Sequence, residues 1–251
     1  MVALRRVSYA FGGYWALKDV TFSLPKGEFL FLTGHSGAGK TTLLRLLYGA
    51  LPLTRGTARV ADFDLHKLKR SQVPELRRKV SVVFQDFKIL PQRSAFENVA
   101  LALKVRGLAR HHLERRVRAI LRAMGLESKS YQKCERLSGG EQQRVAIARS
   151  MVANPKLILA DEPTGNLDHD LTRHLMDLFK QFHTYGTTVI MATHNREILS
   201  MVPEAKVLHL EQGQVVSASP ALTGDAPAES GEPLADPLDG PLADVATGED
   251  A

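Results

Sequence analysis

The sequence contains very little cysteine and no long apolar run. Its one cysteine, Cys134, excludes a framework of intrachain disulfide bonds and fits a reducing compartment. No stretch of about eighteen consecutive apolar residues occurs, so we expect no membrane-spanning helix. No apolar segment follows Arg5 and Arg6, and a secretory signal is therefore not expected. Together these absences predict a cytoplasmic chain.

Basic residues are absent from the end of the sequence. No Lys or Arg follows Lys206, whereas residues 218–251 contain eight acidic residues, so the net charge of +6 divides into +14 for residues 1–217 and −8 for the remainder. The basic part favours an anionic partner such as a nucleotide, a nucleic acid or a lipid surface, but a solvated surface explains the charge equally well. The remainder is rich in Ala, Pro and Gly and has no aromatic residue. We predict that residues 218–251 form a disordered acidic tail.

Four short runs rich in apolar and β-branched residues predict the core of the fold. They are nearly continuous rather than alternating, which is typical of strands that are buried on both faces of a parallel sheet. Helical patterns lie between them, so the sequence predicts an α/β fold. The four runs are Phe29–Thr33, Val80–Phe84, Leu157–Ala160 and Thr188–Ala192.

Further elements are predicted around this core. Helices are expected over about Lys40–Tyr48 and His112–Met124, each followed by a glycine. The stretch over about 86–150 reads as mostly helical and predicts an inserted helical subdomain. Two strand pairs are also expected, Ala3–Phe11 with Leu17–Leu24 around Gly12-Gly13, and Lys206–Leu210 with Val215–Ser217.

A phosphate-binding loop is predicted directly after the first buried strand. The segment Gly34–Thr41 fits G-x-x-x-x-G-K-[ST] at every fixed position, with a strand before it and a helix after it. The glycines let backbone N–H groups turn toward phosphate oxygens, and the helix directs its positive end at the same anion. Lys40 is expected to reach the β- and γ-phosphates, and the Thr41 hydroxyl to bind Mg²⁺. The predicted phosphate-binding residues are Gly34, His35, Ser36, Gly37, Ala38, Gly39, Lys40, Thr41 and Thr42.

Two carboxylates follow the buried strand Leu157–Ala160. A strand of this kind delivers Asp161 and Glu162 to the carboxyl edge of the sheet, where open α/β sheets bind ligands. Asp161 suits Mg²⁺, directly or through water, and Glu162 suits a general base that polarises the attacking water. A solvated acidic turn before Pro163 would explain the pair if it stood alone, but the phosphate loop favours catalysis.

A second glycine-rich turn opens the segment Leu137–Arg144. Ser138 with Glu141 forms a capping box, which explains these two residues but not Gly139 and Gly140 between them. Each glycine in the first turn weakens a helix by roughly 1 kcal/mol relative to alanine. The glycine pair therefore indicates that another group, such as a phosphate, approaches the backbone closely.

The order of these motifs resembles that of the ATPases of ABC transporters. The resemblance covers about Val2–Ser217 and implies a P-loop ABC ATPase fold, with a parallel-sheet core, an N-terminal antiparallel β-subdomain and an inserted helical subdomain. It also implies that the substrate is ATP and the metal Mg²⁺. The series of motifs is completed by Gln85 after one strand, by Gly165-Asn166-Leu167-Asp168, and by His194 after another strand.

The resemblance implies a role for each matching residue. Phe11 is similar to the aromatic residue that stacks on adenine, although Tyr9 and Tyr14 compete for this role. Gln85 is similar to the residue that senses Mg²⁺ and water and faces a transmembrane partner, and His194 to the switch histidine. Two groups of residues are implied to act across an ATP-dependent homodimer. Ser138, Gly139 and Gly140 resemble the motif that contacts the other subunit's γ-phosphate, and Asn166–Asp168 resembles the loop that crosses the dimer interface. The implied catalytic residues are Glu162, His194 and Gln85, the metal-binding residues are Thr41, Gln85 and Asp161, and Asp168 joins the nucleotide-binding set.

Within the family, the chain is most similar to the FtsE-type cell-division ATPases. Val83–Phe87, Glu97–Ala100 and Ala160–Asp168 carry this similarity, together with His35, whereas Asn195 stands where an aspartate is usual. It implies a separate, FtsX-like integral membrane protein as partner and a peripheral location at the cytoplasmic face of the inner membrane. The alternative is the ATPase subunit of a lipoprotein-releasing or macrolide-export transporter.

Other classes of ATPase fit the sequence less well. A chromosome-maintenance ATPase would suit the basic charge, but it needs a long coiled coil where only 95 residues separate Thr41 from Leu137. We therefore expect no nucleic-acid partner. A translation factor of the family would need two phosphate loops. A module that holds ATP without hydrolysing it remains an alternative, against which Glu162 and His194 argue.

Overall fold

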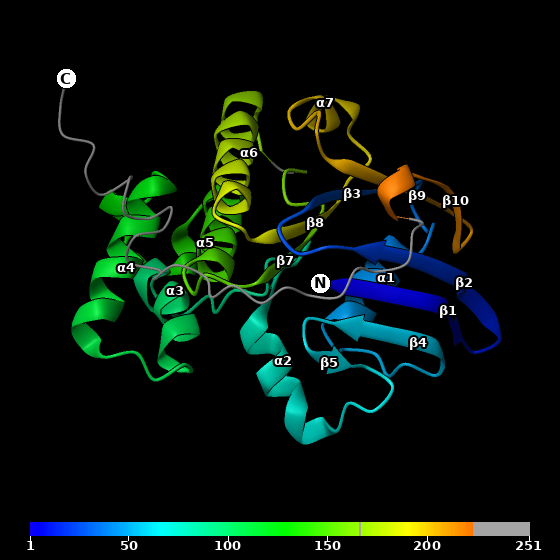
Figure 1. The fold of residues 1–251 in the computed structure, drawn as a ribbon. Helices are drawn as coiled ribbons and strands as arrows, with labels where there is room; N and C mark the ends of the chain where they lie inside the picture. Colours follow the sequence, from blue (N-terminus) through cyan, green and yellow to red (C-terminus); the bar gives the residue numbers. More distant parts are fainter. Residues whose placement is uncertain (166, 223–251) are drawn as a thin grey trace.

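The computed structural model describes residues 1–165 and 167–222 and contains the predicted parallel sheet (Figure 1). The strand order is β10-β9-β3-β8-β7-β6, and all neighbours are parallel except β10, which runs antiparallel to β9. The four predicted core strands are confirmed, and β9 and β10 match the predicted late hairpin. The strands are β3 Phe29–Thr33, β6 Val80–Val83, β7 Leu157–Asp161, β8 Thr188–Ala192, β9 Lys206–Glu211 and β10 Gln214–Ala218.

Successive side chains of β3 lie on opposite faces of the sheet and pack in two different hydrophobic cores, as expected of a strand that is buried on both faces. Phe29 and Phe31 lie in one core, with the helices α3, α4, α5 and α6. Leu30 and Leu32 lie in the other, with α1 and the antiparallel sheet. The continuous apolar pattern of the sequence therefore reflects burial on both sides of the sheet.

The second sheet is antiparallel and has the strand order β2-β1-β4-β5. The predicted N-terminal pair is confirmed as β1 and β2, whereas β4 and β5 were not expected from the sequence. Helix α1, Lys40–Leu47, buries four leucines in the core shared with this sheet. The strands are β1 Val2–Phe11, β2 Tyr14–Leu24, β4 Arg55–Val60 and β5 Phe63–Asp64.

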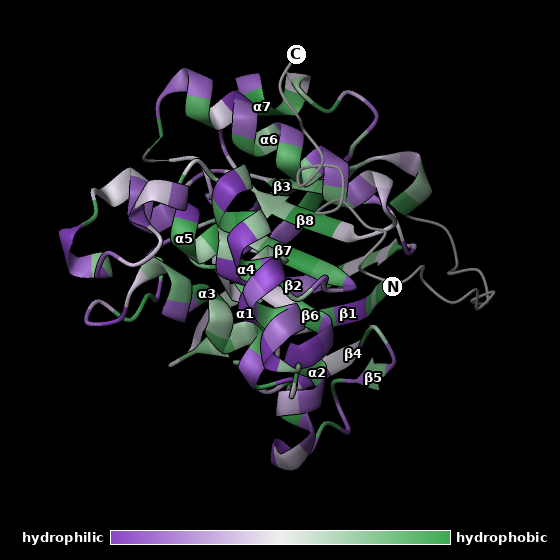
Figure 2. Cartoon of the chain, turned by 90° about the vertical axis from the view of Figure 1, so that its left-hand side faces the viewer, coloured by the Kyte–Doolittle hydropathy of each residue, from purple (hydrophilic) through white to green (hydrophobic). Residues whose placement is uncertain are grey.

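Helices α3, α4 and α5 pack on one another at one end of the sheet (Figure 1). Helix α4 begins two residues before its predicted start, and Figure 2 shows hydrophilic residues along its outer side. The apolar residues Leu113, Val117 and Ile120 are buried on its inner side. The helices are α2 Val73–Lys79, α3 Ala95–Lys104, α4 Arg110–Ala123, α5 Gly139–Met151, α6 His169–Thr184 and α7 Arg196–Ser200; the short 3₁₀ turns are Arg70–Gln72, Glu127–Lys129, Cys134–Arg136 and Pro220–Leu222.

The predicted start of the acidic tail at Ala218 is wrong. Ala218 pairs with Leu208 in the sheet, and the following Pro220–Leu222 forms a 3₁₀ turn. The reason is burial: Leu222 is fully enclosed in the core beside the antiparallel sheet. The ordered chain thus continues at least to Leu222, and the rest of the predicted tail lies outside the described residues. No helix in the described ranges is both long and apolar enough to cross a membrane.

Candidate nucleotide site

A cleft of about 640 Å³ opens at the carboxyl ends of β3, β7 and β8. Open α/β sheets bind ligands at this edge. The cleft brings together most of the residues singled out from the sequence, and the tip of the β1–β2 hairpin closes one side. Its lining consists of Phe11, Tyr14, Ala16, the loop and helix residues 35–42, Gln85, Asp161, Glu162, Gly165 and His194.

The phosphate loop takes its shape from glycines at positions where other residues are strained. Gly34, Gly37 and Gly39 all have positive φ, at 141°, 80° and 103°. A Cβ on Gly34 would lie 2.3 Å from the carbonyl oxygen of Leu210, and one on Gly39 would lie 2.5 Å from that of Ala16. Gly37, by contrast, faces open space. Gly34 lies behind the loop and does not line the cleft, so its role is to let the loop approach β9.

Lys40 places a positive charge at the centre of the loop. Its side chain is largely buried, and its ammonium donates to the carbonyl oxygens of Gly34 at 2.7 Å and His35 at 3.0 Å. The helix α1 begins at Lys40 and carries no acidic residue in its first turn. The partial positive charge at the start of α1 and the full charge of Lys40 therefore act on the same region, which makes the loop a site for a polyanion.

Asp161 provides a buried carboxylate beside Thr41, the last residue of the phosphate-loop motif. Burial raises the pKa of Asp161 and the neighbouring Glu162 raises it further, whereas the Thr41 hydroxyl, which hydrogen-bonds to Asp161, and Lys40 lower it. A divalent cation would offset the burial cost of this carboxylate. The hard oxygen donors of Thr41, Gln85 and Asp161 border the same cleft and fit Mg²⁺. Within the described residues no cluster of three or more His, Cys, Asp or Glu could hold a metal alone, so nucleotide oxygens would have to complete this site.

Glu162 is held in place by His194. The imidazole Nδ1 lies 2.8 Å from the carboxylate Oε1, and the Glu162 main-chain N–H donates to Ala192 at 3.0 Å. Glu162 also has a φ of 49°, an unfavourable conformation for a non-glycine residue, which costs about 1–3 kcal/mol. Strain of this kind persists where the surrounding structure fixes it, and it is concentrated at functional sites. The side chain of Glu162 is 17% exposed and faces the cleft.

Two aromatic residues border the outer part of the cleft. Phe11 is 45% exposed and Tyr14 is 65% exposed, and both line it. Tyr9 does not line the cleft but packs edge-on against Phe11, with the ring centroids 4.9 Å apart. Of the candidates for stacking on a base, Phe11 and Tyr14 are therefore in position, and Tyr9 supports Phe11.

The second glycine-rich turn does not reach this cleft within the chain. Ser138 caps α5 and accepts from the Glu141 N–H at 3.4 Å, while Glu141 accepts from the Ser138 N–H at 2.9 Å, so the capping box exists. Neither Ser138, Gly139 nor Gly140 lines the cleft. A Cβ on Gly139 would have nothing within 4 Å, so packing within the chain does not require this glycine.

Asp168 also lies outside the cleft and caps another helix. Its carboxylate accepts from the Leu171 N–H at 2.9 Å at the start of α6. Asn195, the departure from the usual aspartate, caps α7 by accepting from the Glu197 N–H at 2.9 Å. The predicted interface residue Asn166 lies outside the described residues.

Sequence reasoning missed two side chains of α5 that connect it to the site. Gln143 donates to the carbonyl oxygen of Pro163, the residue after Glu162. Arg149 donates to the carbonyl oxygens of Phe87 at 2.9 Å and Lys88 at 2.8 Å, just after Gln85, and burial lowers the pKa of this arginine. Phe87 and Lys88 both have positive φ, so Arg149 holds an unusual turn. No local sequence signal distinguishes these polar residues from solvent-facing ones of the same helix.

The comparisons with known proteins agree with this geometry. Residues 17–165 match the family model described as ABC transporter. Two dimeric structures of the ATP-binding cassette MJ0796, one of them in a post-hydrolysis state bound to ADP and Pi, superpose with TM-scores of 0.82 at 32% identity, covering 88% of this chain and 99% of theirs. The fold and the cleft thus define an ATP hydrolase of the ABC type.

Comparison with related sequences identifies the family within this class of ATP hydrolases. The cell division ATP-binding protein FtsE of Streptococcus pneumoniae is 47% identical over 204 residues, which cover 81% of this chain and 88% of the relative. The FtsE proteins of Mycobacterium tuberculosis and Escherichia coli K12 are 46% and 45% identical over 201 residues, with 80% of this chain and 87% and 90% of the relatives covered. The chain belongs to the FtsE family of ABC ATPases. These relatives do not favour the lipoprotein-release or macrolide-export alternative.

Proposed function

We propose that this chain is the ATP-hydrolysing subunit of a bacterial cell-division complex, in which ATP-driven dimerisation acts on a separate, FtsX-like integral membrane protein. The partner would hold the chain at the cytoplasmic face of the inner membrane. One observation carries the enzymatic part of the proposal. The cleft joins Lys40, Asp161, Glu162 and His194, but it leaves the glycine-rich turn at Ser138 outside. The similarity to FtsE supports the cell-division part.

Binding of ATP rests on the loop residues 35–42 and one aromatic ring. The backbone N–H groups of the loop surround the phosphates, and Lys40 exchanges its two carbonyl partners for phosphate oxygens. Phe11, supported by Tyr9, stacks on the adenine. Thr41, Gln85 and Asp161 hold Mg²⁺, which when bound neutralises charge on the phosphate oxygens.

Hydrolysis rests on Glu162 as general base. Its carboxylate accepts a hydrogen bond from the attacking water and takes up the proton as the oxygen attacks the γ-phosphorus, while the bond from the γ-phosphorus to the bridging oxygen of the β-phosphate breaks and ADP and phosphate are released. His194, at 2.8 Å, fixes the direction of the carboxylate. The fixed pair reorganises little during the reaction, and such preorganisation is a main source of rate enhancement.

The second half of each active site comes from the other subunit. In a two-fold dimer, Ser138, Gly139 and Gly140 of one subunit face the triphosphate bound to the other, because an isologous contact repeats itself. The capping box leaves the start of α5 well formed, and the space at Gly139 leaves room for a phosphate. The known structures of the similar cassette are dimeric, which supports this arrangement.

Two single variants test the assigned roles. Lys40→Ala should lose nucleotide binding, because the only side-chain charge of the loop that reaches the phosphates is removed. Glu162→Gln should bind Mg-ATP normally and should dimerise, but its turnover should fall at least about 100-fold, the scale of general-base catalysis. The measurements are nucleotide affinity, steady-state turnover and sedimentation. Normal turnover of Glu162→Gln would remove Glu162 from the catalytic role.

Mixing two inactive variants tests the composite site. Gly139→Arg places a large side chain at the exposed glycine-rich turn, where a Cβ would meet no atom of its own chain within 4 Å, so the variant should fold. In a mixed dimer of Gly139→Arg with Lys40→Ala, one site is intact and the other has both defects. Partial recovery of turnover supports a composite site in which one site can act alone. No recovery in demonstrated mixed dimers, or full turnover by a proven monomer, would contradict it.

The division role has its own test. The chain should co-purify with the FtsX-like membrane protein of the same organism when both are co-expressed, and depletion of the chain should give filamentous cells that wild type restores and Glu162→Gln does not. Co-purification with a lipoprotein-release permease instead would contradict this part and leave the ATPase intact.

A further inference from the structure

Two buried polar atoms of α5 have no hydrogen-bond partner among the described residues. They are Oε1 of Gln143 and Nε of Arg144, which are neighbours in the second turn of the helix that Ser138 caps. Gln143 is only 2% exposed. A buried acceptor that lacks a donor costs free energy, so such an atom in a folded protein calls for an explanation.

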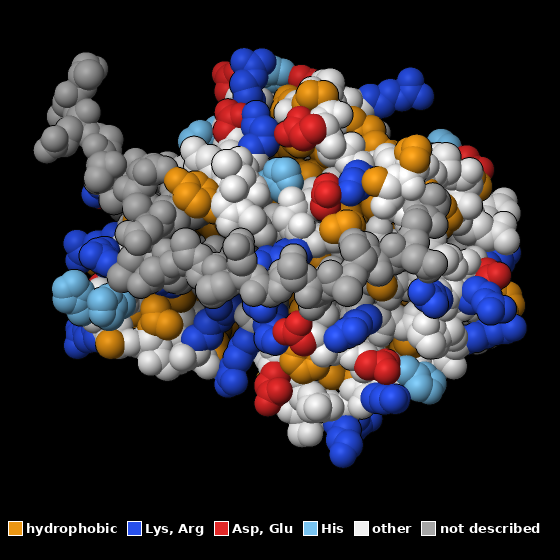
Figure 3. Space-filling view, in the orientation of Figure 1, with side chains coloured by type: hydrophobic (Ala, Val, Ile, Leu, Met, Phe, Trp, Pro, Cys, Tyr) orange, Lys and Arg blue, Asp and Glu red, His pale blue; other side chains and the backbone are white. Residues whose placement is uncertain are grey.

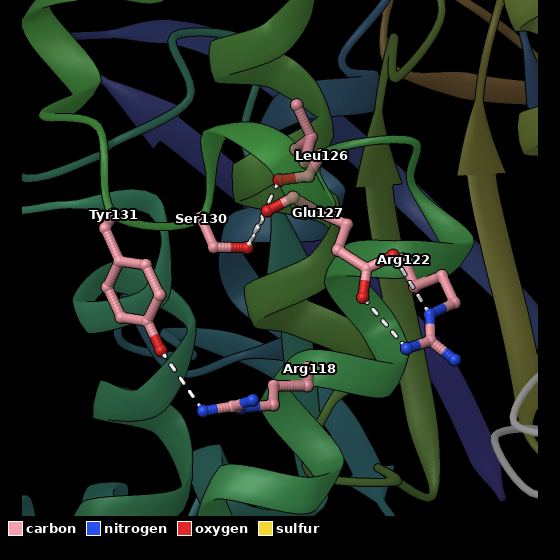
Figure 4. A network of polar contacts seen from close by, with 6 residues as sticks. All are labelled: Arg118, Arg122, Leu126, Glu127, Ser130 and Tyr131. Carbon is pink, nitrogen blue, oxygen red and sulfur yellow. Dashed lines mark hydrogen bonds and ion pairs between the residues drawn. The ribbon is translucent and has the colours of Figure 1, made fainter.

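Other polar groups of the helical region are paired. Arg122 donates to both carboxylate oxygens of Glu127, at 2.8 Å and 3.1 Å, and the Ser130 hydroxyl donates to the Glu127 carbonyl oxygen at 2.7 Å (Figure 4). Figure 3 shows Lys and Arg side chains at the surface of the molecule, where water satisfies such groups. The half-satisfied amide of Gln143 therefore differs from its surroundings.

The unpaired end of Gln143 follows from the role of its other end. The Nε2 group donates to the main-chain carbonyl oxygen of the buried Pro163, the residue after Glu162. Turning the amide over would place Oε1 against this carbonyl oxygen, and two acceptors repel each other. The contact with Pro163 thus fixes the amide and leaves Oε1 without a donor. What the glutamine provides in exchange is a fixed position for Pro163.

The main chain at Glu162 depends on such contacts. Glu162 has a φ of 49°, and it precedes a proline, which favours an extended conformation at the residue before it. A conformation that is unfavourable for both reasons persists only where the surrounding structure maintains it. The Glu162 N–H donates to the Ala192 carbonyl oxygen of β8 at 3.0 Å, and Gln143 of α5 holds the next residue. Glu162 therefore lies between one anchor on the sheet and one on the helix.

We propose that Gln143 is a positioning residue for Glu162. By holding Pro163 it fixes the main chain of Glu162, and His194, at 2.8 Å, fixes the carboxylate itself. Together they set the direction in which the carboxylate meets the attacking water. A misplacement of about 1 Å in an active site lowers the rate on the order of 100-fold. The inference rests on the function proposed above, because it takes Glu162 as the general base.

Gln143→Met and a matched control separate positioning from stability. The methionine removes the unpaired acceptor but leaves the Pro163 carbonyl oxygen unpaired, so the urea midpoint should stay near that of wild type. Turnover should nevertheless fall at least about tenfold, while the KM for Mg-ATP and ATP-driven dimerisation stay near wild type. The control is Thr187→Val: the buried Thr187 hydroxyl also donates to a proline carbonyl oxygen, that of Pro155 at 3.3 Å, outside the cleft. This control should unfold at a lower urea concentration and turn over at the wild-type rate.

Gln143→Glu gives an independent readout that does not require the methionine variant to fold. A neutral carboxyl group can donate its O–H to Pro163, whereas a carboxylate would repel the carbonyl oxygen. Burial raises the pKa of a carboxyl group, so the neutral form gains as the pH falls. Turnover of Gln143→Glu relative to wild type should therefore recover between about pH 8 and about pH 6.

The outcomes distinguish this inference from the function on which it rests. Turnover that simply follows the unfolding midpoint in all three variants would show a structural role and overturn the proposal. A deficit of Gln143→Glu that does not change with pH would do the same. Full turnover of Gln143→Met beside an inactive Glu162→Gln would overturn the positioning role alone, whereas normal turnover of Glu162→Gln would overturn the proposed general base as well.

Discussion

Truncation after Ser217 should destabilise the protein, whereas truncation after Leu222 should not. Leu222 is fully buried, and burying a leucine side chain contributes about 1.5–3 kcal/mol. Ser219 adds two hydrogen bonds: its N–H donates to the Val207 carbonyl oxygen at 2.9 Å, and its hydroxyl accepts from the Val207 N–H at 2.9 Å. Each contributes about 0.5–1.5 kcal/mol. We therefore expect removal of residues 218–222 to cost about 2.5–6 kcal/mol in the free energy of unfolding.

Urea denaturation of the two truncated chains measures this difference. Truncation after Leu222 keeps every contact just named, so its free energy of unfolding should match that of the full chain within about 0.5 kcal/mol. The shorter chain should unfold at least about 1 M earlier, because urea slopes of small domains are about 1–3 kcal/mol/M. In the full chain, Leu222→Ala isolates the buried side chain and should cost about 2–5 kcal/mol. Equal midpoints for the two truncations would refute the assignment of residues 218–222 to the folded core.

The phosphate loop and the start of α5 allow two further predictions. In urea denaturation, Gly34→Ala should lower the free energy of unfolding by at least about 2 kcal/mol more than Gly37→Ala. Both glycines have positive φ, but only at Gly34 would an added Cβ meet a carbonyl oxygen, that of Leu210 at 2.3 Å. Equal losses would mean that this close approach is unimportant. The hydrogen bond from Lys129 lowers the pKa of Glu141, so the stabilisation is complete at pH 7 and is lost as the pH falls below about 4.3 through the folded-state value. The difference in Tm between wild type and Glu141→Gln should therefore shrink from pH 7 to pH 3.5, and a constant difference would contradict this.

The sequence predicted the parts of the site that depend on local pattern. The strand Phe29–Thr33 and the phosphate loop after it require only a buried run, glycines and a helix start, all within about fifteen residues. The placement of Asp161 and Glu162 follows from the rule that parallel strands end at one edge. The structure brings these segments to one cleft, with Gln85 and His194 beside them. The sequence assigned base stacking to Phe11, with Tyr9 and Tyr14 as competitors; the structure places Phe11 and Tyr14 at the same opening, so Tyr14 stays the alternative.

The parts that the sequence did not predict depend on distant residues. The outer side of the phosphate loop lies against the β9–β10 hairpin. The Gly213 N–H donates to the Ala38 carbonyl oxygen at 3.1 Å, and the Gly213 carbonyl oxygen accepts from the main-chain N–H of Lys18 at 2.7 Å. This contact joins three segments that are far apart in the chain. The same hairpin brings Leu222 under the antiparallel sheet, which is why composition alone placed the end of the fold too early. Composition reflects the average polarity of a segment and does not identify a single leucine, Leu222, that packs in the core.

Helix α5 connects the glycine-rich turn at Ser138 to the segments that carry Glu162 and Gln85. Its first turn carries Ser138 and the glycine pair, which the geometry of this chain leaves free to meet another molecule. One turn further, the Gln143 side chain donates to the carbonyl oxygen of Pro163, the residue after Glu162. Near its end, Arg149 holds the turn that follows Gln85. In the proposed dimer, a nucleotide docked at the start of α5 is thus connected through one helix to the residue after Glu162 and to the turn after Gln85 of the same subunit, and we expect nucleotide binding at one site to affect the other through these contacts.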